Sequence, residues 1–292
     1  MAAITIGVPV FNEAARLGRC LDNLRDQTFT DFEVLILDNA SEDATGEVAK
    51  TYAAQDKRFR YTRQPINRGQ AGNHHDVMLA ATSPYFHWRA ADDSSDLNYL
   101  EVLHGLLEAN PAKSMAVGRD LGIFEGEVIR TTHFPRLKND RGLSDLLKLM
   151  FGGPPSWFYG LYRREVLAPI VARVGRDYAT GGWGHDFIID LPFFMDHAVI
   201  GTDATTFRVA LRPRRGAPGQ PEPPRTEPDL DMMLAIRSQF LGIAQTFVDE
   251  RARTGAERAF WAIMLRLYAD RRVYKTKHIL RRGARRLIGL KP

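Results

Sequence analysis

Acidic side chains stand at the ends of two predicted strands, where they would meet a ligand. Asp38 ends the apolar segment 32–38, and Asp92 and Asp93 follow the segment 85–88. Carboxylates in such places accept hydrogen bonds from a base or ribose, or hold a hard cation through oxygen. Because a diphosphate in a neutral-to-acidic cleft needs a cation to offset its charge, Asp92 and Asp93 predict a Mg²⁺ or Mn²⁺ site.

A third carboxylate, Asp186, follows the glycine-rich segment 181–184 and opens an apolar run that continues to Met195. Asp186 can cap the helix that starts there. Residues 94–96 can likewise cap a helix that starts near Leu97.

Two tryptophans and three histidines lie near these segments. Trp157 and Trp183 flank glycine-rich turns, where an indole ring can stack on a sugar face; the alternative for both is a buried core position. His74, His75 and His185 have no zinc-ligand spacing, so structural or hydrogen-bonding roles are expected for them.

The segments that position these side chains alternate between strand and helix. Strands are predicted at residues 4–10, 32–38, 59–62 and 85–88, and helices at 13–27, 44–52, 70–82 and 97–107. Such alternation is typical of a doubly wound α/β fold with a mostly parallel, Rossmann-like central sheet. Right-handed crossovers bring the carboxyl ends of the strands to one edge, where ligands bind.

The rest of the chain divides into three further parts. Residues 113–211 are of mixed α+β character, with strands predicted at 115–124, 127–131, 157–163, 199–202 and 206–211, and helices at 143–151 and 186–195. Residues 212–229 hold six prolines and predict a linker or a loop at the active site. Residues 230–292 predict two helices, at about 230–250 and 255–280, and a basic tail.

Several well-known nucleotide motifs are absent from the sequence. The first strand is followed by PVFNE rather than by a G-x-G-x-x-G loop, and no P-loop occurs anywhere. Four other motifs stand in order: residues 8–13 (VPVFNE), 37–43 (LDNASED), 67–73 (NRGQAGN) and 89–93 (RAADD). Because these four motifs stand in this order and at these strand ends, the chain resembles the family 2 glycosyltransferases of GT-A fold.

This resemblance implies an inverting, metal-dependent transfer of a sugar from a nucleotide sugar, with UDP the expected nucleotide. Asp92 and Asp93 would hold the metal, with Asp93 also close to the sugar, and Asp186 would be the base, with His185 where the family often has a glutamate. The residues implied to bind donor or acceptor, together with Trp157, Trp183 and His185, are Pro9, Phe11, Glu13, Asp38, Asn67, Arg68, Gly69, Asn73 and Asp93.

The sequence departs from the family pattern at two positions. Asn39 stands where a second aspartate is common, and Ala90 stands where the first aspartate of D-x-D-D is usual. These departures leave open a non-catalytic binding subunit as an alternative. A sugar nucleotidyltransferase is a second alternative, although it would be expected to carry a glycine-rich, basic loop after the first strand.

Composition and charge limit the setting and the partners. The 292 residues are 44% hydrophobic and 26% charged, with a single cysteine, Cys20, which predicts a reducing, cytoplasmic setting and a core position for that side chain. No signal-peptide pattern or long apolar run is present. Residues 271–292 carry nine Lys/Arg and no acid, whereas the other 270 residues have a net charge of −4. The family resemblance implies a nucleotide-sugar donor and a saccharide or glycolipid acceptor. Because the charge outside the tail is not basic, no nucleic acid partner is expected, and the basic tail either lies on an anionic membrane or packs on its own domain or a homodimer partner.

Overall fold

The computed structural model describes residues 1–138, 142–175, 178, 184–211, 229–274, 276–277 and 279–280. Its centre is one nine-stranded sheet with the strand order β3-β2-β1-β4-β8-β6-β9-β5, with β7 paired to β6. The sheet contains strands from both sides of residue 112, where the first part of the chain was expected to end. The two sets of strands are joined because β4 pairs antiparallel with β8. The predicted α/β fold with a mostly parallel central sheet is confirmed for the first half of the chain and becomes mixed in the second.

Four parallel strands form the first half of the sheet: β1 (Ile4–Val10), β2 (Phe32–Asp38), β3 (Phe59–Arg63) and β4 (Tyr85–Trp88). They coincide with the predicted strands to within one residue. Their carboxyl ends share one edge, and the register aligns Val10 with Asp38 there. The edge therefore carries the motifs that the sequence placed at strand ends.

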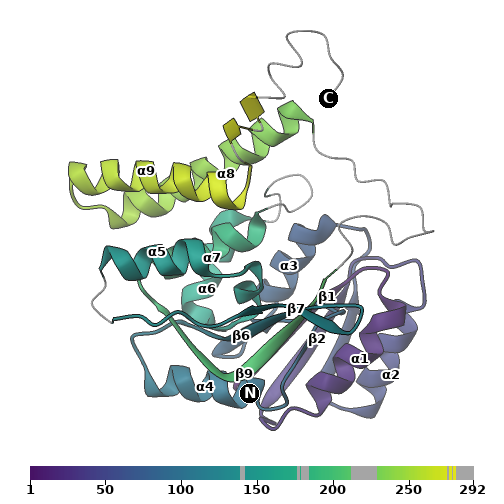
Figure 1. Ribbon diagram of the computed structural model, residues 1–292. Coiled ribbons are helices and arrows are strands. Elements are labelled where there is room, and N and C mark those ends of the chain that lie inside the picture. The colour runs from purple at the N-terminus through teal and green to yellow at the C-terminus, as the bar shows by residue number, and fades with distance from the viewer. Residues whose placement is uncertain are drawn as a thin grey trace.

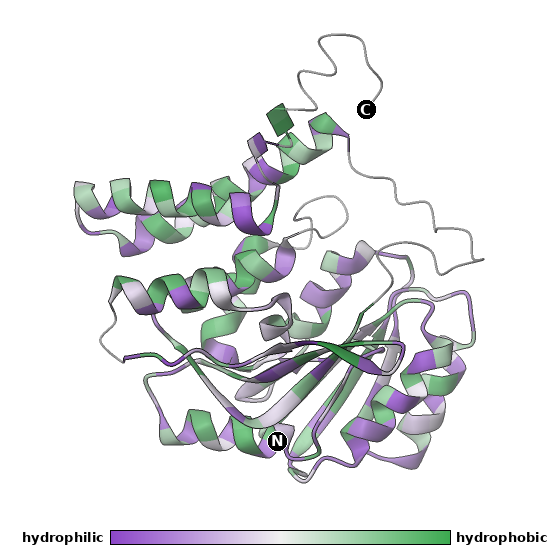
Figure 2. Ribbon diagram, viewed as in Figure 1, coloured by the Kyte–Doolittle hydropathy of each residue, from purple (hydrophilic) through white to green (hydrophobic). Residues whose placement is uncertain are grey.

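Helices cover both faces of this half (Figure 1). They are α1 (Ala14–Arg25), α2 (Thr45–Gln55), α3 (Gly69–Leu79) and α4 (Tyr99–Ala109). Apolar side chains separate into two buried clusters: one joins β1 and β2 to α1 and α4, and the other joins α3 to the later helices. Cys20 belongs to the first cluster at 2% exposure, which confirms its core role. Figure 2 shows hydrophilic residues along α1 and α2.

The second half of the sheet mixes strand directions. Its strands are β5 (Ser94–Ser95), β6 (Met115–Phe124), β7 (Glu127–Thr132), β8 (Leu161–Arg163) and β9 (Val199–Ala210). β9 runs parallel to β6 with a register shift between Val117 and Arg119, and its far end pairs with β5. Ser94 and Ser95 are therefore strand residues, whereas the helix that follows begins at Tyr99 with Asn98 as its N-cap.

Two predictions for the second half were wrong in detail, and one helix was missed. Residues 157–163 do not form one strand, because Pro155 starts the 3₁₀ helix η1 (Pro155–Tyr159) and only β8 follows. The two strands predicted at 199–202 and 206–211 are a single long strand, β9. Helix α6 (Arg164–Val174), with Pro169 inside it, was not predicted.

The remaining helices form a separate layer of the molecule. α5 (Leu143–Gly152) and α7 (His185–Met195) lie above the sheet, and the antiparallel-looking pair α8 (Leu230–Arg251) and α9 (Gly255–Arg272) packs on top of them (Figure 1). No helix in the described ranges has a stretch apolar enough to cross a bilayer. Nearly all of the proline-rich segment, residues 212–228, lies outside the described residues.

A fully buried arginine joins the two halves of the sheet. Arg89 follows β4 at 0% exposure. Its guanidinium donates to Asn23 Oδ1 of α1 (3.0 Å) and Ser95 Oγ of β5 (2.8 Å), and its Nε lies 3.3 Å from His87 Nε2. It also stacks 5.0 Å from the ring centre of Phe207 in β9. One side chain thus holds α1, β4, β5 and β9 together.

Arg89→Met should destabilise the fold by about 2–4 kcal/mol, because three polar partners lose their buried donor. Chemical denaturation measures the loss. The matched change Arg60→Met, on the surface at 70% side-chain exposure, should stay within about 0.5 kcal/mol of wild type. Equal effects of the two substitutions would contradict this role for Arg89.

Candidate active site

The acidic turn after β4 lies directly above Arg89. Asp93 is buried, and its Oδ1 accepts a hydrogen bond of 2.8 Å from the backbone N–H of Ala210 in β9. Burial, reinforced by the neighbouring charge of Asp92, raises the pKa of Asp93 to about 7. A buried carboxylate beside a second one is short of positive charge, which fits a divalent cation.

The donor set of this turn is small. Within the described ranges, no group of three or more acidic, histidine or cysteine side chains is arranged to hold a metal. Mg²⁺ commonly takes only one or two protein carboxylates and completes its coordination with substrate phosphates and water. Asp92 and Asp93 therefore fit a cation that arrives with a diphosphate, better than one held by protein ligands alone.

Asp38 is held by several hydrogen bonds within the protein. Its side chain is fully buried, with Oδ1 accepting from the Ser41 N–H (2.8 Å) and Oδ2 from Tyr61 (2.8 Å) and Arg63 (3.1 Å). Although burial opposes the charged form, hydrogen bonds from Ser41 and Tyr61 and the Arg63 charge lower the pKa of Asp38. Asp38 therefore orders this edge, and its contact with a base stays a prediction.

The hydrogen bonds of Asn39 explain why an asparagine stands at this position of the pattern. It is buried, and its amide Nδ2 donates to Asn67 Oδ1 (2.8 Å) and Gly69 O (3.2 Å), while Oδ1 accepts from the Arg68 N–H (2.7 Å). An aspartate could not donate the first two bonds. Asn39 thus holds the 67–69 segment, where Gly69 adopts φ 74° to start α3.

Asn73 is also a structural residue in this arrangement. Its Nδ2 donates to Leu37 O (3.0 Å), and its Oδ1 accepts from Gln64 (3.1 Å), so its buried amide ties α3 to the end of β2. The expected place of Asn73 beside the diphosphate and the donor sugar stays a prediction. The first turn of α3 has backbone N–H groups of the kind that bind phosphate.

The predicted residues at the end of β1 are more open. Phe11 is 41% exposed, and Pro9 and Glu13 are partly exposed. The Asn12 N–H donates to Ser41 Oγ (3.0 Å), which joins this turn to the end of β2. A solvent-facing ring beside a rigid turn suits stacking on a nucleobase.

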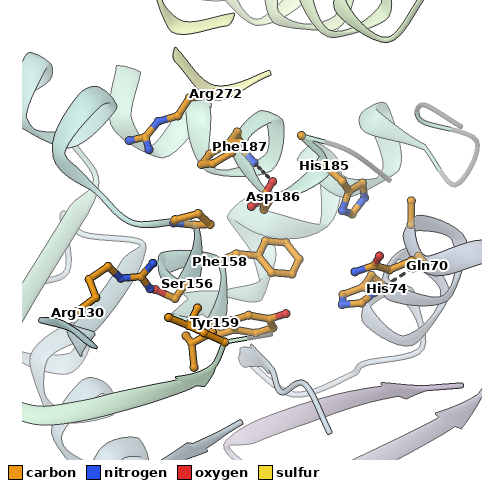
Figure 3. Close-up of a pocket in the computed structure, with 15 residues that line it drawn as sticks. Gln70, His74, Arg130, Ser156, Phe158, Tyr159, His185, Asp186, Phe187 and Arg272 are labelled. Carbon is orange, nitrogen blue, oxygen red and sulfur yellow. Dashed lines mark hydrogen bonds between the residues drawn. The ribbon is translucent and has the colours of Figure 1, made fainter. Parts of the chain in front are cut away.

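A cavity of about 480 Å³ opens beside the start of α7 (Figure 3). It is lined from α3, β7, η1, α7, β9 and α9. The polar or aromatic side chains in its wall are Gln70, His74, Arg130, Ser156, Phe158, Tyr159, His185, Asp186, Phe187 and Arg272. Elements from all parts of the chain therefore meet at one site.

Asp186 lies on the wall of this cavity. Its Oδ1 accepts from the adjacent Phe187 N–H (2.9 Å), and Gly184, at φ 80°, occupies the N-cap position instead. The predicted alternative, that Asp186 is the helix cap, is therefore wrong. Burial raises the pKa of Asp186 to about 6, against backbone N–H groups and the Arg272 charge, which lower it. A carboxylate with that pKa is well matched to accepting a proton near neutral pH.

His185 stands next to Asp186 and turns toward α3 (Figure 3). It is 6% exposed, and its Nε2 is buried with no hydrogen-bond partner in the described part of the chain. Burial, helped by His74 and His75, lowers the pKa of His185 to about 3, so the imidazole is neutral at physiological pH. An unsatisfied ring nitrogen on a cavity wall is suited to meeting a hydroxyl of a bound ligand.

Tyr159 lines the same cavity as Asp186. Burial raises its pKa well above the usual value, and the charges of Asp93, Asp186 and Asp92 add to the effect. The acidic turn lies next to this cavity, because Asp93 accepts from the Ala210 N–H and the neighbours of Ala210, Val209 and Leu211, are part of the cavity wall.

Two arginines of the cavity were not predicted. Arg130 of β7 bonds Asp120 Oδ1 (2.8 Å), and Arg272 of α9 donates to the backbone oxygens of Met150 (2.8 Å) and Gly153 (2.7 Å). Arg272 also lies 4.9 Å from the Phe187 ring centre. Neither arginine belongs to a sequence motif. Arg130 lies on a hairpin, and Arg272 belongs to the segment that the sequence predicts to be a basic tail.

The two tryptophan predictions end differently. Trp157 is 2% exposed and packs against Phe134 and Phe194, with ring centres 5.5 and 6.2 Å away, so no ring face is open to a sugar. Its substrate contact is corrected to the core alternative, and the next residues, Phe158 and Tyr159, provide the aromatic wall instead. Trp183 lies outside the described residues.

Comparison with known proteins decides the family. The profile described as Glycosyl transferase family 2 matches residues 5–170. The chain belongs to this family. Similar curated members include a putative glycosyltransferase EpsH of Bacillus subtilis, 30% identical over 56% of this chain and 48% of its own, and GlyA of Streptococcus pneumoniae, 30% identical over 42% of this chain and 18% of its own. The chain thus spans less than half the length of either relative.

Solved structures show the same fold. Staphylococcus aureus TarS matches with a TM-score of 0.61 at 14% identity, over 92% of this chain and 43% of its own. The mannosyltransferase PcManGT of Pyrobaculum calidifontis, in complex with GDP-Man and Mn²⁺, matches with a TM-score of 0.54 at 19% identity, over 99% and 88%. These likenesses establish the GT-A glycosyltransferase fold expected from the motifs.

Asp186→Asn should stabilise the protein above about pH 6, because the folded state holds a carboxylate whose pKa is raised above its unfolded value. That penalty appears as the pH rises through about 4 and is complete above about 6. Unfolding at about pH 8 should show a gain on the order of 1–3 kcal/mol that disappears by about pH 4. The same stability difference at both pH values would contradict the raised pKa.

Proposed function

We propose that this chain transfers a sugar from a nucleotide sugar to an acceptor hydroxyl with inversion at the anomeric carbon, in polysaccharide or glycoconjugate assembly. The observation that carries the proposal is Asp186, a carboxylate with a pKa of about 6 on the wall of a cavity that also reaches Tyr159, beside the acidic turn. Residues 1–112 would bind the donor and residues 113–211 the acceptor.

Asp186 acts as the general base in this mechanism. It takes the proton of the acceptor hydroxyl as that oxygen attacks C1 of the donor sugar from the face opposite the diphosphate. The bond from C1 to the diphosphate oxygen breaks with its electron pair, and a nucleoside diphosphate leaves. His185, neutral and with an unpaired Nε2, holds a sugar hydroxyl in the same cavity.

The donor lies along the edge where β1, β2 and β4 end. Phe11 stacks on the base, Pro9 and Glu13 line the nucleotide pocket, and the first turn of α3 binds the diphosphate with help from Arg68. A Mg²⁺ or Mn²⁺ ion held by Asp92 and Asp93 supplies positive charge for the leaving diphosphate when it is bound.

The names of relatives support the substrate classes. A TarS structure contains UDP-GlcNAc, and PcManGT was solved with GDP-Man and Mn²⁺, so both nucleotides suit the fold. A relative from Campylobacter jejuni, 25% identical over 57% of this chain, is a glucosyltransferase that acts on a PP-undecaprenol-linked saccharide. We therefore propose a UDP-sugar donor, a saccharide or lipid-linked acceptor, and action in the cytoplasm close to the inner membrane face.

Ligand-dependent unfolding tests the donor proposal. UDP should raise the melting temperature, and Mn²⁺ should increase the shift, since a ligand at about 100 times its Kd stabilises the native state by roughly 2.7 kcal/mol. GDP, UDP-GlcNAc and GDP-Man complete the panel. If no nucleoside diphosphate stabilises the protein with or without metal, the proposal fails.

Matched variants locate the metal contribution. Asp92→Asn and Asp93→Asn should lose the Mn²⁺-dependent part of the shift while UDP alone still binds. Asp26→Asn, a change at an acid that is 58% exposed and outside the acidic turn, should respond to UDP and Mn²⁺ as wild type does. A full Mn²⁺ effect in both site variants would remove the metal role from this turn.

A further inference from the structure

Helix α9 has a second apolar face, which points away from the protein. Phe260, Ile263 and Leu267 follow one another at helical spacing and are 36%, 61% and 52% exposed. The opposite side of the helix packs inward, with Met264, Leu265, Tyr268 and Ala269 buried. In Figure 1 the α8–α9 pair lies at the far side of the molecule from β1 to β3, and Figure 2 shows hydrophobic residues recurring along it.

Arginines outnumber acids on α9 around this outer stripe (Phe260, Ile263 and Leu267), although Glu257 is exposed one turn before Phe260. Arg266 and Arg271 are exposed on α9, whereas Asp270 is paired with Arg237 at 2.6 Å. The chain from residue 271 to 292, which extends past the described residues, carries nine Lys/Arg and no acid. An exposed apolar stripe is therefore continuous with a purely basic segment.

We propose that the outer stripe of α9 docks on an anionic lipid surface. Such a helix places its apolar side chains at the boundary of headgroups and acyl chains, while arginines at its edges contact lipid phosphates. This inference concerns location and does not depend on the proposed transfer reaction.

A second copy of the chain fits this face less well. Two stripes packed together would bring the exposed Arg266 side chains of the two copies to the edges of one interface, and like charges repel. A stable dimer also buries about 1,200–2,000 Å², more than one helix face with three large apolar side chains offers. An anionic surface satisfies the apolar and the charged features together.

The same helix reaches the cavity from its other side. Arg272 follows the exposed Arg271 and lines the cavity. Its guanidinium donates to the backbone oxygen of Gly153, just before η1. Docking through α9 therefore holds the cavity close to the lipid surface. An acceptor carried on a lipid would meet Asp186 without leaving the membrane.

Flotation of the full chain with vesicles tests the proposal. Wild type should float with vesicles that contain phosphatidylglycerol and stay behind with phosphatidylcholine alone, and added salt should weaken the binding. Phe260→Ser, Ile263→Ser and Leu267→Ser together should reduce partition roughly tenfold or more. In the matched variant, Leu79, Leu97 and Ile129 are changed to serine; these residues are 45%, 47% and 60% exposed and lie outside α9. This variant should float as wild type does.

Several results would overturn the proposal: wild type ignores anionic vesicles, the stripe variant binds them as well as wild type, or the matched variant loses binding equally. Sedimentation that shows a wild-type dimer and a monomeric stripe variant would instead assign the face to a second copy. Equal melting temperatures check that the stripe variant is folded, and Ile263→Ser alone, at the most exposed of the three positions, replaces it if they differ. Because the readout is lipid binding, it is unaffected if no nucleotide binds.

Discussion

The arrangement of the site depends on the contacts of the buried Arg89 guanidinium. Charged groups are rarely buried without a network of partners, and this one bonds α1 through Asn23 and β5 through Ser95 while it lies over Phe207 of β9. Together these contacts fix the turn that carries Asp92 and Asp93 and bring the end of β9 to it, where the Ala210 N–H bonds Asp93. The acidic turn is therefore held in place by contacts within the protein.

The second constraint comes from the opposite end of the chain. Helix α9 places Arg272 against the start of α7, where its charge opposes the effect of burial on the pKa of Asp186. Burial thus raises the proton affinity of the Asp186 carboxylate, and the nearby Arg272 charge limits the rise. Helix α9 is for this reason part of the candidate site.

Much of the fold followed from the sequence because the first half has strong periodicity. Apolar runs at residues 4–10 and 32–38 and the intervening amphipathic helix predict a parallel sheet, and the motif residues stand at its edge. The roles of Asp38 and Asn73 did not follow, since whether a polar side chain at a strand end faces a ligand or its own protein depends on partners such as Tyr61 and Leu37. Arg272 was also missed, because no local pattern shows that a basic terminal helix folds back onto a cavity.

The central claim is that Asp186 is the base of a glycosyl transfer reaction. The most direct measurement is the release of nucleoside diphosphate from the nucleotide sugar that binds best, in wild type and in Asp186→Asn, together with the Kd of that donor. The account predicts that turnover falls by about 10²–10⁴-fold while the donor Kd changes little. Unchanged turnover in Asp186→Asn would contradict it.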